Sequence, residues 1–222
     1  MTRPLLLDLF CCEGGAATGY HRAGFDVVGV DIEPQDRYPF TFHEFDALEF
    51  LRRYGDHFDA IHASPPCQAY STSTVQHRDA NDYPDLVGVT RELLEASGRP
   101  WVIENVEGAP LVAPGQMTFD GRSSILLCGS MLGMRRVRRH RIFETNWPLI
   151  NPMVCDHQWQ SDVMTIVGHS EQGSTGRRGD HWGLAARREA MGMPWASREG
   201  LPEAIPPAYT EYVGHWLMEH LL

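Results

Sequence analysis

The sequence predicts an α/β fold, a Rossmann-like, doubly wound and mostly parallel sheet with a small irregular insert. Over the first two thirds of the 222 residues, short apolar runs alternate with helical patterns. Such alternation is typical of successive strand–helix–strand units. Glycines follow two of the helical patterns, at Gly24 and Gly98, as they commonly do at helix ends. An apolar content of 42% is sufficient for one domain with a large core.

The expected elements follow in chain order. Strands are predicted at residues 5–10, 27–31, 59–63, 101–106, 124–127 and 141–144, and helices at 16–23, 86–96 and 209–222. The last helix follows Pro206 and Pro207, and prolines favour a helix start. From about residue 146 the periodicity weakens, and helical patterning returns near residue 183. We therefore expect a catalytic and cofactor-binding domain at 1–145, an insert at 146–182 and a helical segment at 183–222.

Composition narrows the function classes. A formal net charge of −10 argues against a protein that coats duplex DNA electrostatically, so any nucleic-acid contact should be local. No stretch resembles a signal peptide or a membrane span, which favours a cytoplasmic protein without a membrane partner. Five cysteines without paired spacing predict neither a disulfide framework nor a metal site.

The first motif is a strand, a glycine-containing turn and a helix, "DLFCCEGGAATG", followed by a second strand that ends at Asp31. In such folds the turn lets a ligand approach the backbone, and the acidic residue accepts hydrogen bonds from ribose hydroxyls. A plain structural turn is the alternative. Because a full G-x-G-x-x-G is missing, a dinucleotide is disfavoured.

The second motif places Cys67 after two prolines at the end of a strand, in "HASPPCQAYS". Reactive groups of open α/β sheets gather beyond the carboxyl ends of the strands. Consecutive prolines restrict the backbone, so they hold the thiol in place before a substrate binds. This position favours a functional thiol over a small buried apolar side chain.

Two further motifs carry charge beside apolar strands. Glu104 and Asn105 end the apolar strand "WVIEN", where a carboxylate is costly unless it has a function or a charged partner. A structural salt bridge is therefore an equally good interpretation of Glu104. Arg139 and Arg141 lead into a strand and should point to one face.

In this order, Pro-Pro-Cys-Gln, Glu-Asn-Val and Arg-x-Arg resemble the cytosine-5 DNA methyltransferase family, most closely its small bacteriophage-encoded members. The resemblance covers about residues 4–145 and resumes weakly at "LPEAIPPAYTEYVG". It implies the S-adenosylmethionine-dependent methyltransferase fold, that methyl donor as cofactor, and methylation of cytosine C5 in DNA. Cys67 would then be the nucleophile, Glu104 the general acid, and Arg141, or else Arg139, the ligand of the cytosine O2 atom.

The resemblance also implies further site residues. Gln68 joins the catalytic set, and Ser71 and Asn105 the substrate-binding set. Asp46 would bind the adenine amino group, although an Asp before a helix equally well acts as an N-cap. The expected cofactor-binding residues are Asp8, Phe10, Cys12, Gly14, Gly15, Asp31, Ile32, Asp46 and Pro65.

Departures from the family pattern keep alternatives open. Cys12 stands where the family usually has glycine, and Glu203 where it has asparagine, so a catalytically silent binding module is one alternative. The insert is short, with Arg177 and Arg178 as expected phosphate contacts, so single-stranded DNA, RNA or a free cytosine nucleotide are alternative substrates. A small zinc site from Cys155 and His157 with His169 and His181 is disfavoured by irregular spacing.

Overall fold

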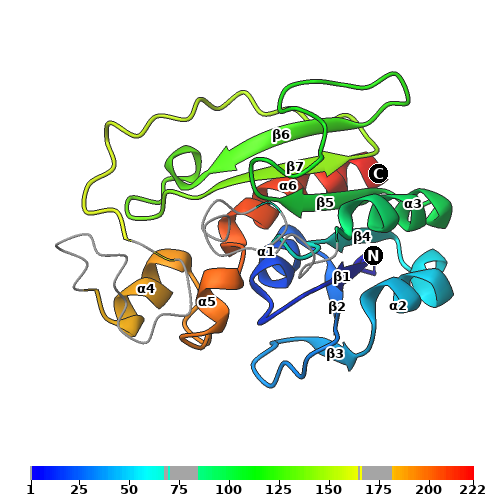
Figure 1. Cartoon of the computed structure of the whole chain (residues 1–222), viewed down its shortest axis with the longest axis horizontal. Helices are drawn as coiled ribbons and strands as arrows, with labels where there is room; N and C mark the ends of the chain where they lie inside the picture. The colour runs from blue at the N-terminus through cyan, green and yellow to red at the C-terminus, as the bar shows by residue number, and fades with distance from the viewer. Residues whose placement is uncertain (1, 68–69, 71–84, 165, 167–181) are drawn as a thin grey trace.

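A computed structural model of the chain describes residues 2–67, 70, 85–164, 166 and 182–222. Seven strands form one sheet in the order β3-β2-β1-β4-β5-β7-β6 (Figure 1). The sheet has the doubly wound, mostly parallel architecture that the sequence predicts. The strands are β1 (Leu5–Leu9), β2 (Asp26–Asp31), β3 (Thr41–Glu44), β4 (Ala60–Ala63), β5 (Trp101–Asn105), β6 (Ser123–Cys128) and β7 (His140–Thr145).

Helices surround this sheet, and the described part of the chain contains two short 3-10 helices as well. The α-helices are α1 (Gly15–Ala23), α2 (Ala47–Tyr54), α3 (Val87–Ser97), α4 (Leu184–Met191), α5 (Gly200–Glu203) and α6 (Pro207–Leu221). The 3-10 helices are η1 (Gly55–His57) and η3 (Gly129–Leu132). The helices α4 and α5 lie together beyond one end of the sheet, at the left of Figure 1.

The expected strands and helices differ from the observed ones by one or two residues at their ends. The strand missing from the prediction is β3, a four-residue edge strand of sequence Thr-Phe-His-Glu whose side chains are mostly exposed. A short exposed strand lacks both the apolar run and the alternation by which strands are recognised. It pairs with β2 in parallel register, from Val28 opposite Thr41 to Asp31 opposite Glu44.

Strand direction determines which ends meet. The strands β1 to β5 pair in parallel, whereas β7 runs antiparallel to both β5 and β6. The carboxyl ends of the parallel strands therefore meet the amino end of β7 at one edge of the sheet. All four motifs of the sequence analysis reach this edge.

The core has a layer on each face of the sheet. Along β1, Leu6 joins the cluster that contains α1 and α6, whereas Leu7 joins the cluster that contains α2 and α3. This alternation is the two-residue period of a strand buried on both faces. The two helices α1 and α6 approach closely: a Cβ atom on Gly19 would lie 2.1 Å from Thr210 Oγ1.

The segment 146–164 contains no helix or strand, as expected of the insert. Trp147 and Leu149 at its start belong to the main core, whereas Met164 and Ile166 join a third cluster with residues of α4 and α5. The division into units at 145/146 and 182/183 remains a prediction. No helix in the described ranges is both long and apolar enough to cross a membrane.

Candidate active site

Cys67, Glu104 and Arg141 come from three neighbouring elements at the common edge of the sheet. Cys67 lies four residues after β4, Glu104 belongs to β5, and Arg141 belongs to β7. The register pairs Ala63 with Ile103, and Asn105 with Ile142. The motif-bearing ends of β4, β5 and β7 thus lie side by side.

The loop that carries Cys67 is tied to β5 by Asn105. The Asn105 side chain is buried, and its Nδ2 donates a hydrogen bond of 2.9 Å to the carbonyl of Pro65. Its Oδ1 accepts from the Val106 amide at 2.9 Å. With both polar atoms bonded to backbone, Asn105 positions the Pro-Pro-Cys turn, and its expected contact with the substrate stays a prediction. Pro65 is buried in that turn, and its expected contact with the cofactor likewise stays a prediction.

Glu104 and Arg141 form an ion pair, with 2.9 Å between Oε1 and Nε. Glu104 is 5% exposed, and burial raises the pKa of its carboxyl. The charges of Arg141 and Arg139 and the Ser64 hydroxyl oppose that rise without cancelling it. The salt bridge, which is the alternative interpretation of Glu104, is therefore present. Burial also makes this carboxyl easier to protonate than a free one, which is the direction that a general acid needs.

The two arginines do not share one role. Arg139 precedes β7, and its guanidinium donates to the carbonyls of Ile166 at 3.2 Å and Pro202 at 2.8 Å. Burial and the Arg141 charge lower the pKa of Arg139. Arg141 pairs with Glu104, while Arg139 donates to carbonyls of distant loops, yet the charges of both arginines act on Glu104 and on Cys67. That both side chains act from one strand face stays a prediction.

The environment of the Cys67 thiol disfavours its ionisation. Burial raises the pKa of Cys67 and the Glu104 charge adds to the rise, whereas Arg141 and Arg139 lower it. Desolvation therefore outweighs the arginine charges at this thiol. Protonation of Glu104 would remove one opposing charge and so favour the thiolate.

Behind Glu104 lies a buried polar chain that the sequence analysis missed. Tyr20 Oη lies 3.0 Å from His62 Nδ1, and His62 Nε2 lies 2.8 Å from Ser64 Oγ. Burial lowers the pKa of His62 to about 3, so its imidazole is neutral. The Ser64 hydroxyl in turn contacts the Glu104 carboxyl. A histidine inside the otherwise apolar strand "AIHA" is the sequence signal for this chain.

The loop after β1 has an unusual backbone. Phe10, Cys12 and Gly14 all have positive φ, at 58°, 44° and 78°. The Cys12 amide donates to Asp31 Oδ2 at 2.9 Å, which ties the loop to the end of β2. The amides of Cys11 and Gly14 are also bonded within the chain, to the carbonyl of Val30 at 3.2 Å and to that of Cys11 at 3.0 Å. The positive φ of Cys12 also explains why glycine is usual at this position of the family motif.

The residues at the end of β2 present both a carboxylate and an apolar side chain. Asp31 is partly exposed and also accepts the Glu33 amide at 3.1 Å, while Ile32 is 65% exposed. Asp46 caps α2 by accepting the Glu49 amide at 2.8 Å, which is the alternative interpretation of that residue. Asp31 and Ile32 thus fit a ribose and an adenine face. Asp46 acts as an N-cap through Oδ1, and its expected contact with the adenine amino group stays a prediction.

Three other expected cofactor residues have packing roles. Asp8 is fully buried and accepts a hydrogen bond of 3.4 Å from Tyr38 Oη, and burial raises the pKa of its carboxyl. A Cβ on Gly14 would lie 2.7 Å from Pro39 Cδ, and one on Gly15 would lie 2.2 Å from the Ile205 carbonyl. These contacts hold the three residues in or behind the loop after β1, and their expected contact with the cofactor stays a prediction.

Some expected residues lie outside the described residues: Gln68, Ser71, His169, Arg177, Arg178 and His181. Glu203, at the end of α5, is close enough to Cys12 for its charge to help raise the Cys12 pKa, behind burial and Asp31. The late motif thus lies near the loop that follows β1.

The chain is similar to known methyltransferases. The type II methyltransferase M.XorII of Xanthomonas oryzae pv. oryzae is 30% identical over 124 residues, which are 49% of this chain and 29% of that relative. The match therefore spans less than a third of that relative's length. No family model matches the chain.

Two solved structures share the fold over nearly all of their length. The S. pombe Dnmt2 methyltransferase has a TM-score of 0.64 at 13% identity, with 99% of each chain covered. The Entamoeba histolytica methyltransferase EhMeth has a TM-score of 0.63 at 12% identity, with 100% of each chain covered. Sequence and fold together confirm the resemblance that the motifs indicate: this chain has a methyltransferase fold and is similar in sequence to a type II methyltransferase.

Proposed function

We propose that this protein transfers a methyl group from S-adenosylmethionine to C5 of cytosine in DNA, through a covalent bond between Cys67 and C6. The observation that carries the proposal is the junction of Cys67, Glu104 and Arg141 at one edge of the sheet, with Glu104 and Arg141 2.9 Å apart. A methyltransferase fold alone is compatible with transfer to carbon or to an exocyclic nitrogen. A thiol beside a proton-sharing carboxyl distinguishes the first of these, because nitrogen methylation needs no covalent nucleophile.

The cofactor loop fits S-adenosylmethionine. The positive-φ backbone from Phe10 to Gly14 offers close approach to the methionine portion, Asp31 has oxygens for the ribose, and Ile32 offers an apolar face for adenine. The bound donor supplies an electrophilic methyl group on its sulfonium. The rest of the chemistry belongs to residues of this chain.

Cytosine C5 is a weak nucleophile until C6 carries an added group. The Cys67 thiolate adds to C6 while Glu104 protonates N3, so the electron pair of the 5,6 double bond becomes available at C5. Arg141 stabilises the developing charge at O2. After C5 takes the methyl group, loss of the C5 proton and departure of Cys67 restore the ring, and N3 returns its proton to Glu104.

Positioning residues keep the site in this geometry. Asn105 fixes the Cys67 turn through the Pro65 carbonyl, and the chain Tyr20, His62 and Ser64 holds the Glu104 carboxyl from behind. A silent binding module is disfavoured, because the thiol, the carboxyl and the guanidinium needed for the chemistry come together. In duplex DNA the cytosine must leave the stack, at a cost of a few kcal/mol that single strands do not carry.

One assay separates the substrate classes. Purified protein is incubated with labelled methyl donor and, in parallel, duplex DNA, single-stranded DNA, RNA and dCMP, and the products are digested and identified by mass spectrometry. We expect 5-methylcytosine from DNA. N4-methylcytosine or N6-methyladenine as the product would contradict the proposal, and 5-methylcytosine from RNA or dCMP alone would keep the chemistry and change the substrate.

A further inference from the structure

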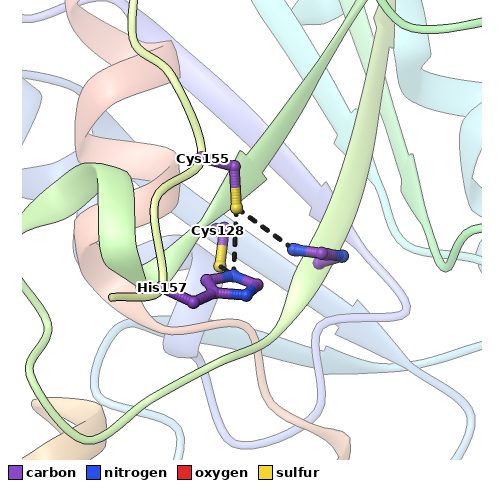
Figure 2. Close-up of side chains that lie close together, drawn as sticks. Cys128, Cys155 and His157 are labelled. Carbon is purple, nitrogen blue, oxygen red and sulfur yellow. Dashed lines mark hydrogen bonds between the residues drawn. The ribbon is translucent and has the colours of Figure 1, made fainter. Parts of the chain in front are cut away.

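A second cluster of reactive side chains lies apart from Cys67, where the β6–β7 ladder meets the segment after residue 150. It contains Cys128, His140, Cys155 and His157, and one ligand atom from each lies within 4.8 Å of all the others. Figure 2 shows the sulfurs of Cys128 and Cys155 directed toward the His157 ring. The proposed chemistry of methyl transfer uses none of these four residues.

The chain builds the cluster from two local pairs. Cys128 ends β6 and His140 begins β7, and the two are direct partners across the antiparallel ladder. Cys155 and His157 are two residues apart in a segment without helix or strand. Two pairs of N and S ligands, each held by short local spacing, are typical of four-coordinate zinc sites.

The distances agree with one shared ion. His157 Nε2 lies 3.0 Å from Cys155 Sγ and 3.3 Å from Cys128 Sγ, and His140 Nε2 lies 3.3 Å from Cys155 Sγ. In a tetrahedral site with Zn–S of about 2.3 Å and Zn–N of about 2.0–2.1 Å, sulfur and nitrogen ligands are about 3.6 Å apart. The observed separations are a few tenths of an ångström shorter, so little movement would admit an ion.

Hydrogen bonding alone accounts poorly for these contacts. A neutral imidazole has one proton or one lone pair on Nε2, so His157 can satisfy only one of its two sulfur neighbours by a normal hydrogen bond. A cation at the centre of the four atoms satisfies all of them, and two thiolates would neutralise its charge.

Outer contacts also match a metal site. His140 Nδ1 lies 2.8 Å from Glu107 Oε2, which leaves Nε2 for the ion, and a carboxylate on the far nitrogen is the usual partner of a metal-bound histidine. Ser130 Oγ lies 3.4 Å from Cys155 Sγ and can donate to the thiolate.

We infer that Cys128, His140, Cys155 and His157 bind one Zn²⁺ ion in a closed, structural site. Four protein ligands leave no open position for a substrate, so the ion stabilises rather than catalyses. It fixes the start of the insert to the β6–β7 ladder. Because His140 stands between Arg139 and Arg141, the ion also fixes the start of the strand that carries Arg141.

The proposed site differs from the metal expectations from the sequence. No metal was expected, and the alternative zinc site combined Cys155 and His157 with His169 and His181. Cys155 and His157 belong to the cluster, whereas His169 and His181 lie outside the described residues. The other two residues of the cluster, Cys128 and His140, are on strands. Cys128 and His140 are far apart along the chain, so their spacing does not predict that they pair, and the β6–β7 register is what brings them together.

The test measures metal in the full-length protein, purified without chelator from cells grown with added zinc. Elemental analysis should give about one zinc per chain. Replacement by Co²⁺ should give the intense visible absorption and the thiolate-to-metal band of a tetrahedral site with sulfur ligands. A preparation with neither stoichiometric zinc nor the Co²⁺ spectrum, or with a Cys128–Cys155 disulfide found by mass spectrometry in its place, would overturn the inference.

Variants locate the ion. Cys155→Ser and His157→Asn change partly exposed residues, so the sheet should still fold, and each should lower zinc content at least tenfold after dialysis. Cys67→Ser and His57→Asn are the matched controls and should retain the metal. Retention of zinc by both cluster variants would place the ion elsewhere and contradict the assignment. Since metal content is the readout, the result does not depend on the proposed methyl transfer.

Discussion

The edge of the sheet that carries Cys67, Glu104 and Arg141 and the segment from residue 146 to 164 are held in different ways. At the edge, each functional side chain follows or belongs to a strand, and the register of β4, β5 and β7 brings the three together. The later segment has no regular structure and depends on side chains: Trp147 and Leu149 in the core, and Gln160, whose Nε2 donates to the carbonyls of Met134 and Val137. Strand register thus positions the functional side chains at the sheet edge, whereas side-chain contacts position the segment after residue 146.

The substitution with the largest expected effect on activity is at the sheet edge. We expect Cys67→Ser to reduce methyl transfer by about a thousandfold or more, because serine is a far weaker nucleophile at the same position. Affinity for S-adenosylmethionine, measured by titration calorimetry, should change little, since Cys67 lies outside the Phe10 to Gly14 loop. Methyl transfer at the wild-type rate would show that the thiol is not needed.

Glu104→Gln should lower the rate of the chemical step by about 10²–10⁴ with a smaller effect on KM, since proton transfer matters most in the transition state. Burial raises the pKa of both Glu104 and Cys67, and transfer requires Glu104 protonated and Cys67 ionised. The wild-type kcat/KM should therefore pass through a maximum and fall at high pH.

Glutamine has no proton to lose, so the fall at high pH should disappear in Glu104→Gln and activity should rise with Cys67 ionisation alone. Glu92→Gln, on the exposed face of α3, is the matched control and should keep the wild-type profile. If kcat/KM of Glu104→Gln still falls at high pH, the group whose ionisation causes that fall is not Glu104.

Asp31→Ala should weaken cofactor binding by about 1–3 kcal/mol, or roughly 5- to 150-fold in Kd. The substitution removes the ribose acceptor and also the contact with the Cys12 amide. Asp26→Ala, at the opposite end of β2, is the control and should leave the affinity unchanged. Equal Kd values for both variants in calorimetry would move the ribose site away from Asp31.

The smallest effect concerns the strained loop. Cys12 has a φ of 44°, and a left-handed backbone costs a non-glycine residue about 1–2 kcal/mol, a cost that glycine avoids. Glycine in turn destabilises the folded state by about 0.5–1 kcal/mol, because it has more backbone entropy to lose on folding. Cys12→Gly should therefore change the free energy of unfolding by about 1 kcal/mol or less. Cys11→Gly, at a buried residue without positive φ, should instead destabilise the fold by about 1–3 kcal/mol in denaturant titrations. Equal effects of both changes would show that the loop is not strained.

The same contrast explains what could be predicted from the sequence. Strand ends at Leu9, Asp31, Ala63 and Asn105 follow from local apolar runs, and these ends position the motif residues. The exposed strand β3 has no such signal. The buried partners His62 and Ser64, the positioning role of Asn105 and the Cys128–His140 pair depend on contacts between distant segments, which periodicity does not encode.

The covalent bond to Cys67 is the central claim, and trapping it is the most direct test. DNA that contains 5-fluorocytosine is incubated with the protein and S-adenosylmethionine, because fluorine at C5 cannot leave as a proton and so blocks the release of Cys67. We expect an adduct that survives denaturation, and peptide mass spectrometry should locate it on Cys67. A preparation that methylates cytosine in ordinary DNA yet forms no adduct, or forms it on another residue, would contradict the account.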